Sequence, residues 1–277
     1  MPELPEVETI ARGLRPQLVG AVLTAAEVYW PRMLGRLAPH ELSAQVAGRR
    51  VDWVGRRGKY VVLGLDSGFL LFHLKMSGRL AVTPAGEPAS AHLRAVFHLA
   101  DGRQLRFYDT RKFGRIYLVD RLEAVTGRLG PEPLSDELSA GEFQRMLARR
   151  AGRLKSLLLN QEFLAGLGNI YADEALFAAR LHPLRLAGTL APAEQLRLYE
   201  AIRTVLSRAV ASGGSTLRDR GFVDVEGQAG LFQNEVCVYG RRGEPCPVCG
   251  TAIERTVIGG RSAHFCPHCQ TRPPEFP

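Results

Sequence analysis

Four of the five cysteines stand in two pairs near the C-terminus, and their spacing constrains the local fold more than any other feature. Cys246 and Cys249 are separated by two residues, as are Cys266 and Cys269, and sixteen residues lie between the pairs. This is the spacing of a zinc ribbon, in which four thiolates hold one tetrahedral ion. The alternative is two disulfides in a secreted domain, which the absence of a signal-peptide pattern at the N-terminus disfavours.

Two histidines, His264 and His268, lie close enough to the cysteines to compete as zinc ligands. Four thiolates are the simpler set, so we expect one structural zinc and no catalytic metal or organic cofactor. A hairpin this small cannot fold on its own core, and metal binding would therefore supply its folding energy. The fifth cysteine, Cys237, is expected to be simply buried.

The hydrophobic pattern divides the rest of the chain. Residues 6–19 have apolar side chains at helical spacing and end at Gly20. Residues 22–120 carry short runs rich in Val, Leu, Phe and Tyr, broken by Gly, Asp and Pro, which is typical of a β-sandwich. Beyond Gly130 the period is helical, and Ser135 or Ser139 is placed to cap the first helix.

These patterns predict an α+β fold with three parts. The stretch 215–232 has little apolar periodicity, and a long structureless segment in a compact domain is usually functional or disordered. The predicted parts are an N-terminal β-sandwich with a leading helix over 1–130, a helical domain over 131–236 that includes the 215–232 loop, and a zinc-ribbon β-hairpin over 237–271.

The charge balance favours a polyanionic partner such as nucleic acid. Basic residues number 36 against 28 acidic ones, and the formal net charge is +8. Only four basic residues are lysines, namely Lys59, Lys75, Lys112 and Lys155. Arginine cannot release its proton and lysine can, so a lysine in this arginine-rich chain can mark a titratable amine, and Lys59 ranks first. No apolar run is long enough to span a membrane, and we expect a cytoplasmic protein.

The N-terminus offers a possible nucleophile. If Met1 is removed, the ring nitrogen of Pro2 becomes a secondary amine. A free α-amino group titrates near pH ~8, so a useful fraction is neutral at pH 7. Such an amine can attack a sugar carbon and form a covalent iminium, with Glu3 beside it as a proton donor. The alternative is an ordinary helix start, where proline and acidic residues are common.

The string Pro2–Thr9 (PELPEVET) resembles the start of bacterial formamidopyrimidine-DNA glycosylases, and five further stretches fit that family in its order. They are Arg57–Tyr60, His73–Gly78, Asp109–Gly114, Gly166–Tyr171, and Gly260-Arg261 ahead of Cys266. The resemblance implies a β-sandwich, a helix–two-turns–helix module and a C-terminal zinc finger, in agreement with the pattern above. It also implies a base-excision repair enzyme that removes oxidised purines from DNA and then nicks the strand.

The resemblance implies four catalytic residues. Pro2 would attack C1′ and displace the damaged base, while Glu3 would protonate the ring oxygen of the sugar. Lys59 would assist β-elimination of the 3′ phosphate, and Arg261 would assist δ-elimination of the 5′ phosphate. Because arginine is a poor proton donor, we interpret Arg261 chiefly as a clamp on the leaving phosphate.

The same resemblance implies the DNA contacts. The target nucleotide must leave the stack, and an apolar side chain must fill the gap. Met76 and Phe113 would be these wedges, although either residue taken alone would more often be part of a core. Arg111 would pair with the orphaned base, and His92 and Asn169 would contact phosphates. Asn169 opens a predicted helix and could also be its N-cap.

The chain departs from the family pattern at three positions. Ala151 stands where the family often has a lysine, and Arg150 or Arg153 could take over that phosphate. Lys75 stands where glycine is common, and Thr110 where proline is common. Lys75 therefore adds charge beside the predicted wedge.

The implied partner is double-stranded DNA that contains oxidised bases or abasic sites, bound by a nucleoid-associated monomer without membrane contact. Two other hypotheses stay open at this point: a glycosylase for oxidised pyrimidines, and a non-catalytic zinc-ribbon protein that binds DNA. Leu4 and the Met76, Arg111 and Phe113 set favour the oxidised-purine branch. A covalent protein–DNA adduct would separate both enzymes from the binding protein.

Overall fold

The computed structural model describes residues 1–217 and 222–272, and the chain divides into two compact units. Met1–Arg128 and Ser212–Gln233 form the first unit, and Leu129–Ala211 and Asn234–Pro277 form the second. The predicted loop at 215–232 therefore lies in a segment grouped with the first unit, and its residues 218–221 lie outside the described part. The domain boundaries drawn from the sequence stay predictions.

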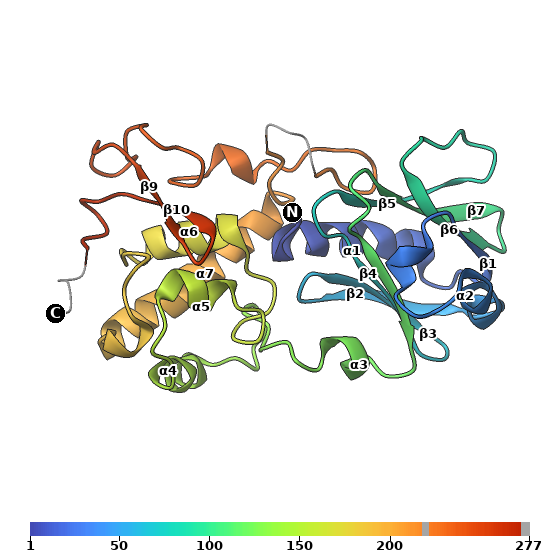
Figure 1. Ribbon diagram of the computed structural model, residues 1–277, viewed down its shortest axis with the longest axis horizontal. Helices are drawn as coiled ribbons and strands as arrows, with labels where there is room; N and C mark the ends of the chain where they lie inside the picture. The colour runs from blue at the N-terminus through green and yellow to red at the C-terminus, as the bar shows by residue number, and fades with distance from the viewer. Residues whose placement is uncertain (218–221, 273–277) are drawn as a thin grey trace. The chain divides into compact units, whose positions relative to one another are not determined.

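The first unit is a sandwich of two four-stranded antiparallel sheets, as predicted (Figure 1). One sheet has the order β1-β6-β7-β5, and its strands are Leu23–Val28, Leu93–Leu99, Arg103–Asp109 and Gly78–Pro84. The other has the order β2-β3-β4-β8, and its strands are Val51–Arg57, Tyr60–Leu65, Phe69–His73 and Arg115–Val119. Helix α2 (Pro39–Val46) and the short helices η1 (Pro31–Leu34) and α3 (Glu123–Thr126) complete the main elements.

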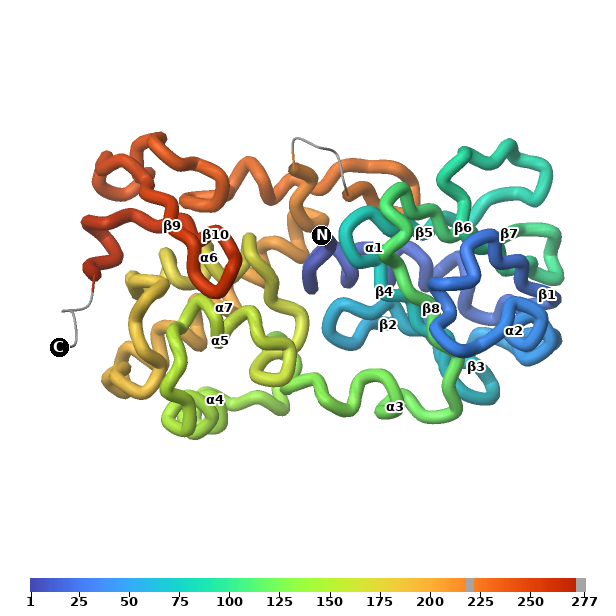
Figure 2. The backbone as a smooth tube through the Cα atoms, in the orientation of Figure 1, coloured from blue at the N-terminus to red at the C-terminus, as the bar shows by residue number. Residues whose placement is uncertain are grey.

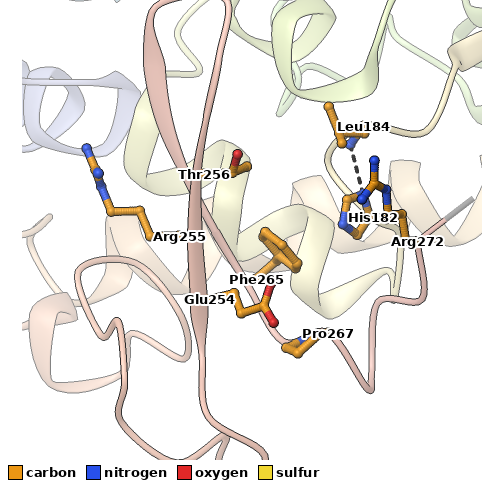
Figure 3. A pocket seen from close by; sticks show the side chains of 8 residues that line it. All are labelled: His182, Leu184, Glu254, Arg255, Thr256, Phe265, Pro267 and Arg272. Atoms are coloured by element: carbon orange, nitrogen blue, oxygen red, sulfur yellow. Dashed lines mark hydrogen bonds between the residues drawn. The ribbon is translucent and has the colours of Figure 1, made fainter.

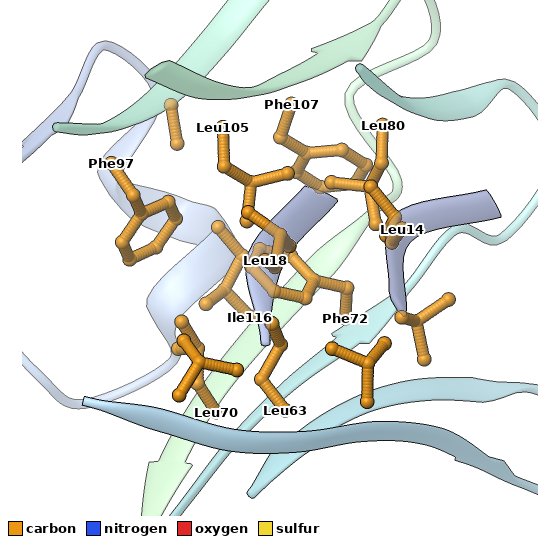
Figure 4. Packing of buried hydrophobic residues seen from close by; sticks show 14 of the residues in the cluster. Leu14, Leu18, Leu63, Leu70, Phe72, Leu80, Phe97, Leu105, Phe107 and Ile116 are labelled. Carbon is orange, nitrogen blue, oxygen red and sulfur yellow. The ribbon is translucent and has the colours of Figure 1, made fainter. Parts of the chain in front are cut away.

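Helix α1 (Leu4–Leu18) contributes one apolar stripe to the core of the sandwich. Four of its buried residues, Val7, Ile10, Leu14 and Leu18, recur every three or four positions. Figure 4 shows Leu14 and Leu18 among side chains from both sheets. Burying an aliphatic side chain fully stabilises the fold by about 1.5–3 kcal/mol. The stripe therefore holds α1 firmly in the sandwich and determines the position of the residues at its N-terminal end.

The second unit consists mainly of helices and ends in a β-hairpin. The helices are α4 (Ala140–Ala148), α5 (Leu154–Leu159), α6 (Asn169–Ala178) and α7 (Pro192–Ala211), with short turns η2 (Ala187–Thr189) and η3 (Phe232–Asn234), the latter crossing from one unit to the other. Of the two predicted caps for α4, Ser139 is the one used, since its Oγ accepts the Glu142 N–H at 3.2 Å. Within the described residues, no helix is both long and apolar enough to cross a membrane.

The hairpin consists of β9 (Glu254–Ile258) and β10 (Arg261–Phe265), which lie side by side in Figure 2. Gly259 and Gly260 connect them with φ of 57° and 74°. A two-residue turn with positive φ at both positions matches the twist of the strands and favours glycine. Arg261 therefore stands at the tip of the hairpin, where its side chain is exposed.

Candidate functional site

The N-terminal residues are held by one buried carboxylate. Glu6 Oε2 accepts the Glu3 N–H at 2.7 Å, and its Oε1 accepts the Ser215 N–H at the same distance. A Cβ on Gly214 would lie 2.8 Å from Oε1, so only glycine allows this approach. Pro2 and Glu3 are both buried at the start of α1. Sequence reasoning assigned Glu6 no role, although an acidic residue three positions after a helix start is a capping-box signal.

The turn between β2 and β3 carries Lys59, which is 7% exposed. Arg56 connects this turn to α1, because its Nε donates to Glu8 Oε2 at 3.1 Å and its Nη1 donates to Gly58 O at 3.0 Å. The first turns of α1 and the Lys59 turn therefore lie at the same end of the sandwich.

The turn between β4 and β5 lies at that end too. Tyr60, next to Lys59, is paired in register with His73 at the end of β4. Burial, with Lys75 and then Lys59, lowers the pKa of His73 to about 3. His73 is therefore neutral near pH 7, and it adds no charge near Lys75 and Lys59.

The predicted wedge residues are exposed rather than part of the core. Met76 is 37% exposed and Phe113 is 49% exposed. Asp109, itself buried, joins their two loops: its carboxylate accepts the Ser77 hydroxyl and the backbone N–H groups of Arg111 and Gly114. Large exposed apolar side chains held in place by a buried carboxylate indicate an interaction surface.

Arg111 and His92 extend this surface. The Arg111 guanidinium lies over the Phe113 ring, 5.0 Å from its centroid, which is a cation–π contact. His92 is exposed, and its carbonyl accepts the Asp109 N–H at 2.9 Å. Contacts within the first unit thus bring Met76, His92, Arg111 and Phe113 together. The contacts of Arg56 and the register of Tyr60 place Lys59 and the start of α1 at the same end of the sandwich.

The second unit carries the other predicted residues. Asn169 is the first residue of α6, whereas Gly168 is the N-cap, so the predicted capping role for Asn169 is wrong. Its Nδ2 donates instead to Ser262 Oγ at 3.0 Å, beside Arg261, which connects α6 to the hairpin tip. Arg153 is exposed just before α5. Ala151 and Thr110, two of the departures from the family pattern, are exposed as well.

Two consecutive acidic residues of α6 hold the C-terminal module. Asp173 accepts Lys155 Nζ at 2.6 Å and both the backbone N–H and ring Nδ1 of His264 at 2.9 Å. Glu174 accepts the backbone N–H groups of Cys237, Val238 and Tyr239 at 2.8, 3.0 and 2.8 Å. Burial raises the pKa of Glu174 despite these three donors. Sequence reasoning missed this double anchor, because nothing local in Asp173-Glu174 shows what it faces.

We expect Lys155→Met to lower the free energy of unfolding by about 3 kcal/mol. The Lys155 and Asp173 side chains are both fully buried, and removing one partner of a buried pair leaves a charge that is poorly compensated. Chemical denaturation monitored by circular dichroism measures the effect. Arg208→Met is the control, since the Arg208 and Glu235 side chains are 60% and 32% exposed and their pair should contribute less than about 1 kcal/mol. Equal losses for the two variants would contradict the expectation.

The four paired cysteines converge as predicted. Their Sγ atoms all lie within 4.8 Å of one another, and three of the separations are 3.4, 3.5 and 3.9 Å. Tetrahedral zinc with Zn–S bonds of about 2.3 Å places its ligands about 3.8 Å apart. Backbone N–H groups of Val248 and Cys269 also donate to Cys246 Sγ and Cys266 Sγ, each at 3.4 Å. The cluster is therefore consistent with one structural zinc ion, held by four thiolates with no open position.

The competing histidine ligands are turned elsewhere or lie outside the cluster. His264 Nδ1 faces Asp173, and His268 is exposed and is not part of the group of potential ligands found in the described residues. Cys237 also lies outside that group and is half-buried, in part agreement with the prediction of burial.

A cavity of about 480 Å³ lies beside the hairpin (Figure 3). Its lining residues are His182, Leu184, Glu254, Arg255, Thr256, Phe265, Pro267 and Arg272. His182 Nδ1 accepts the Leu184 N–H at 3.2 Å, and burial together with Arg272 lowers the pKa of His182 to about 4. None of the site residues predicted from the sequence lines this cavity.

Comparison with known proteins covers nearly the whole chain. Residues 1–116 match the formamidopyrimidine-DNA glycosylase N-terminal domain, residues 129–221 its H2TH domain, and residues 243–272 a zinc finger found in FPG and IleRS. The formamidopyrimidine-DNA glycosylase of Pelotomaculum thermopropionicum is 48% identical over 98% of this chain and 99% of its own. That of Herpetosiphon aurantiacus is 46% identical over 98% of this chain and all of its own.

Solved structures agree. The MutM (Fpg) protein from Thermus thermophilus is 45% identical, with a TM-score of 0.88 over 99% of this chain and all of that one. Lactococcus lactis Fpg in complex with DNA containing an abasic site is 34% identical, with a TM-score of 0.89 over 98% of this chain and all of that one. The chain therefore belongs to the formamidopyrimidine-DNA glycosylase family.

Proposed function

We propose that this protein is a base-excision repair DNA glycosylase that removes oxidised purines, such as 8-oxoguanine and formamidopyrimidines, and then cleaves the abasic site by β,δ-elimination. One observation carries the proposal. A single end of the sandwich gathers the start of α1, the buried Lys59 and the exposed Met76, Arg111 and Phe113. Lactococcus lactis Fpg, which is similar over 98% of this chain, has been crystallised with abasic-site DNA, and a mutant of it with Fapy-dG DNA.

The reaction starts at Pro2 once Met1 is removed, because the nitrogen of Pro2 is a peptide nitrogen while Met1 remains. The neutral amine attacks C1′ of the flipped nucleotide, and the damaged base departs with the bonding electrons and takes up the proton that the Pro2 nitrogen loses. Glu3 protonates the ring oxygen as the sugar opens to the iminium. Glu6 keeps Glu3 at the start of α1, since it binds the Glu3 backbone N–H from within the core.

Elimination follows because the iminium acidifies the C2′ hydrogen. Lys59 assists the β-elimination that releases the 3′ phosphate. Arg261 stabilises the 5′ phosphate as it leaves in the δ-elimination, as a clamp rather than as a proton donor. No metal takes part in this scheme; the zinc ion would fold the module that carries Arg261.

DNA is held by the remaining site residues. Met76 and Phe113 fill the gap left by the flipped nucleotide, and Arg111 pairs with the orphaned base. His92, Asn169 and Arg153 contact phosphates. We assign these roles to a catalytic domain at 1–130, a helix–two-turns–helix domain at 131–236 with its 215–232 loop, and a zinc finger at 237–271. The protein would act as a monomer on nucleoid DNA in the cytoplasm.

Borohydride trapping tests the proposal. Incubation of the processed protein with an 8-oxoguanine duplex and sodium borohydride is expected to yield a covalent protein–DNA species, with the cross-link at Pro2 by peptide mapping. The same protein with an uncleaved N-terminal extension should give no adduct, because it lacks the free amine. Failure of the processed protein to cross-link would favour a non-catalytic binding protein. Faster excision from a thymine-glycol duplex than from the 8-oxoguanine duplex would instead favour the oxidised-pyrimidine branch.

A further inference from the structure

Lys75 occupies a backbone conformation that lysine disfavours. Its φ is +52°, in the left-handed region where Cβ crowds the following carbonyl and where glycine is favoured. It lies in the turn between β4 and β5, directly before Met76. The turn is closed by the Gly78 N–H, which donates to Leu74 O at 2.8 Å, and by the Lys75 N–H, which donates to His73 Nδ1 at 3.0 Å. Glycine would make these backbone contacts without strain, so the turn itself does not account for the presence of a lysine side chain here.

The ammonium group of Lys75 lies near a second cation. Arg115 begins β8 and is paired in register with His73. Burial, and then Arg115, lower the pKa of Lys75, so its positive charge is unfavourable where it stands. Among the described residues, Arg115 Nη1 donates to the backbone carbonyls of Phe113 and Gly114. Neither Lys75 nor Arg115 forms an ion pair with a carboxylate in residues 1–217 and 222–272.

The neighbouring groups do not offset this charge. The low pKa of His73 keeps its ring neutral, and Lys59, which also lowers that pKa, is a further cation. Two half-buried cations without a carboxylate are stabilised when an anion binds between them. A phosphate accepts hydrogen bonds from both a lysine ammonium and an arginine guanidinium.

We propose that Lys75 and Arg115 form a phosphate site, which binds a DNA phosphodiester beside the nucleotide that Met76 displaces. This inference rests on the proposed function, because it takes DNA as the source of the phosphate. The site would explain why a lysine occupies a left-handed position. The backbone conformation is unfavourable for lysine, and the contact between its ammonium group and the phosphate offsets this cost when DNA binds.

The salt dependence of DNA binding tests this site. Each neutralised phosphate contributes about −0.9 to the slope of log K against log salt concentration. Lys75→Gln and Lys75→Gly are each expected to make the slope shallower by about 0.9 on a duplex with a non-cleavable abasic-site analogue. Lys75→Arg, which keeps the charge, should retain the parent slope. The glycine variant should also melt roughly 2 °C higher, because it relieves the left-handed lysine.

Arg180→Gly is the matched control. Arg180 is exposed and has φ of +55°, so its replacement removes the same charge and relieves the same backbone conformation outside the proposed site. The inference is overturned if the Lys75 variants keep the parent slope, or if Arg180→Gly lowers the slope equally. A lower melting temperature of Lys75→Gly would overturn the claim of a backbone cost. Failure of the proposed function is distinguishable, since the parent would then not prefer the abasic-analogue duplex over an undamaged one.

Discussion

Replacing Glu3 with glutamine is expected to lower the rate of base removal by about 10²- to 10⁴-fold, which is the usual contribution of a positioned acid–base group. Glutamine has the shape of glutamate but cannot donate a proton to the sugar oxygen. Glu3 is 3% exposed and directly follows Pro2, so no water-borne acid easily substitutes for it. Single-turnover excision from an 8-oxoguanine duplex measures the loss, and affinity for the same duplex should be unchanged.

The competing explanation is that Glu3 only stabilises the start of a helix. Glu41 lies in the first turn of α2 and accepts the Ala38 N–H at 2.8 Å, as Glu6 accepts that of Glu3 in α1, so Glu41→Gln is a control for changing a helix-start carboxylate away from the site. A charge at a helix N-terminus contributes about 0.3–1 kcal/mol to stability. Both variants should show such small losses in denaturation, and only Glu3→Gln should lose excision. Normal excision by Glu3→Gln would remove Glu3 from the mechanism.

Replacing Cys246 with serine is expected to abolish zinc binding and the fold of the C-terminal hairpin together. Structural zinc in small finger peptides is bound with about 10–16 kcal/mol, and this energy is also the folding energy. In the described part of the chain, the apolar residues buried around the cluster are few, with Val238 and Ile253 among them, and offer little alternative core. Metal analysis should fall from one zinc per chain to none, and affinity for lesion DNA should fall with it.

Cys237→Ser separates the loss of a ligand from the loss of a thiol. Cys237 is half-buried near the module but outside the four-cysteine group, so its variant should keep one zinc and its DNA affinity. Zinc retained by Cys246→Ser would contradict the four-thiolate assignment. Normal DNA affinity of a zinc-free protein would show that the hairpin does not contact DNA.

Spacing and periodicity predicted the features that arise from local chemistry. The Cys-x2-Cys pairs specified the thiolate cluster, because four soft ligands at such spacing suit one tetrahedral ion. The apolar stripe of α1 and the alternation of the strands predicted the sandwich, since both patterns report which face is buried.

Features that depend on long-range contacts were not predictable in the same way. Glu6 meets Ser215 across 209 positions, and Asp173 meets His264 across 91. No local pattern encodes such partners. The positive φ of Lys75 was not predicted either: glycine is common at this position in the family, but the lysine itself gives no signal of a left-handed turn. The exposure of Met76 and Phe113 needed the structure, since single apolar residues more often lie in a core.

The adjacent anchors on α6 have a consequence for protein engineering. Asp173 binds His264, two residues before Cys266, and Glu174 binds the backbone at Cys237, in the segment that leads into the zinc finger. The zinc finger therefore could not be transferred to another protein as the cysteine-containing segment alone. The transferred segment would have to include α6 and Lys155. A one-residue deletion within α6 ahead of Asp173 would rotate the Asp173 and Glu174 side chains by about 100° about the helix axis, so that both would lose their contacts with the zinc finger.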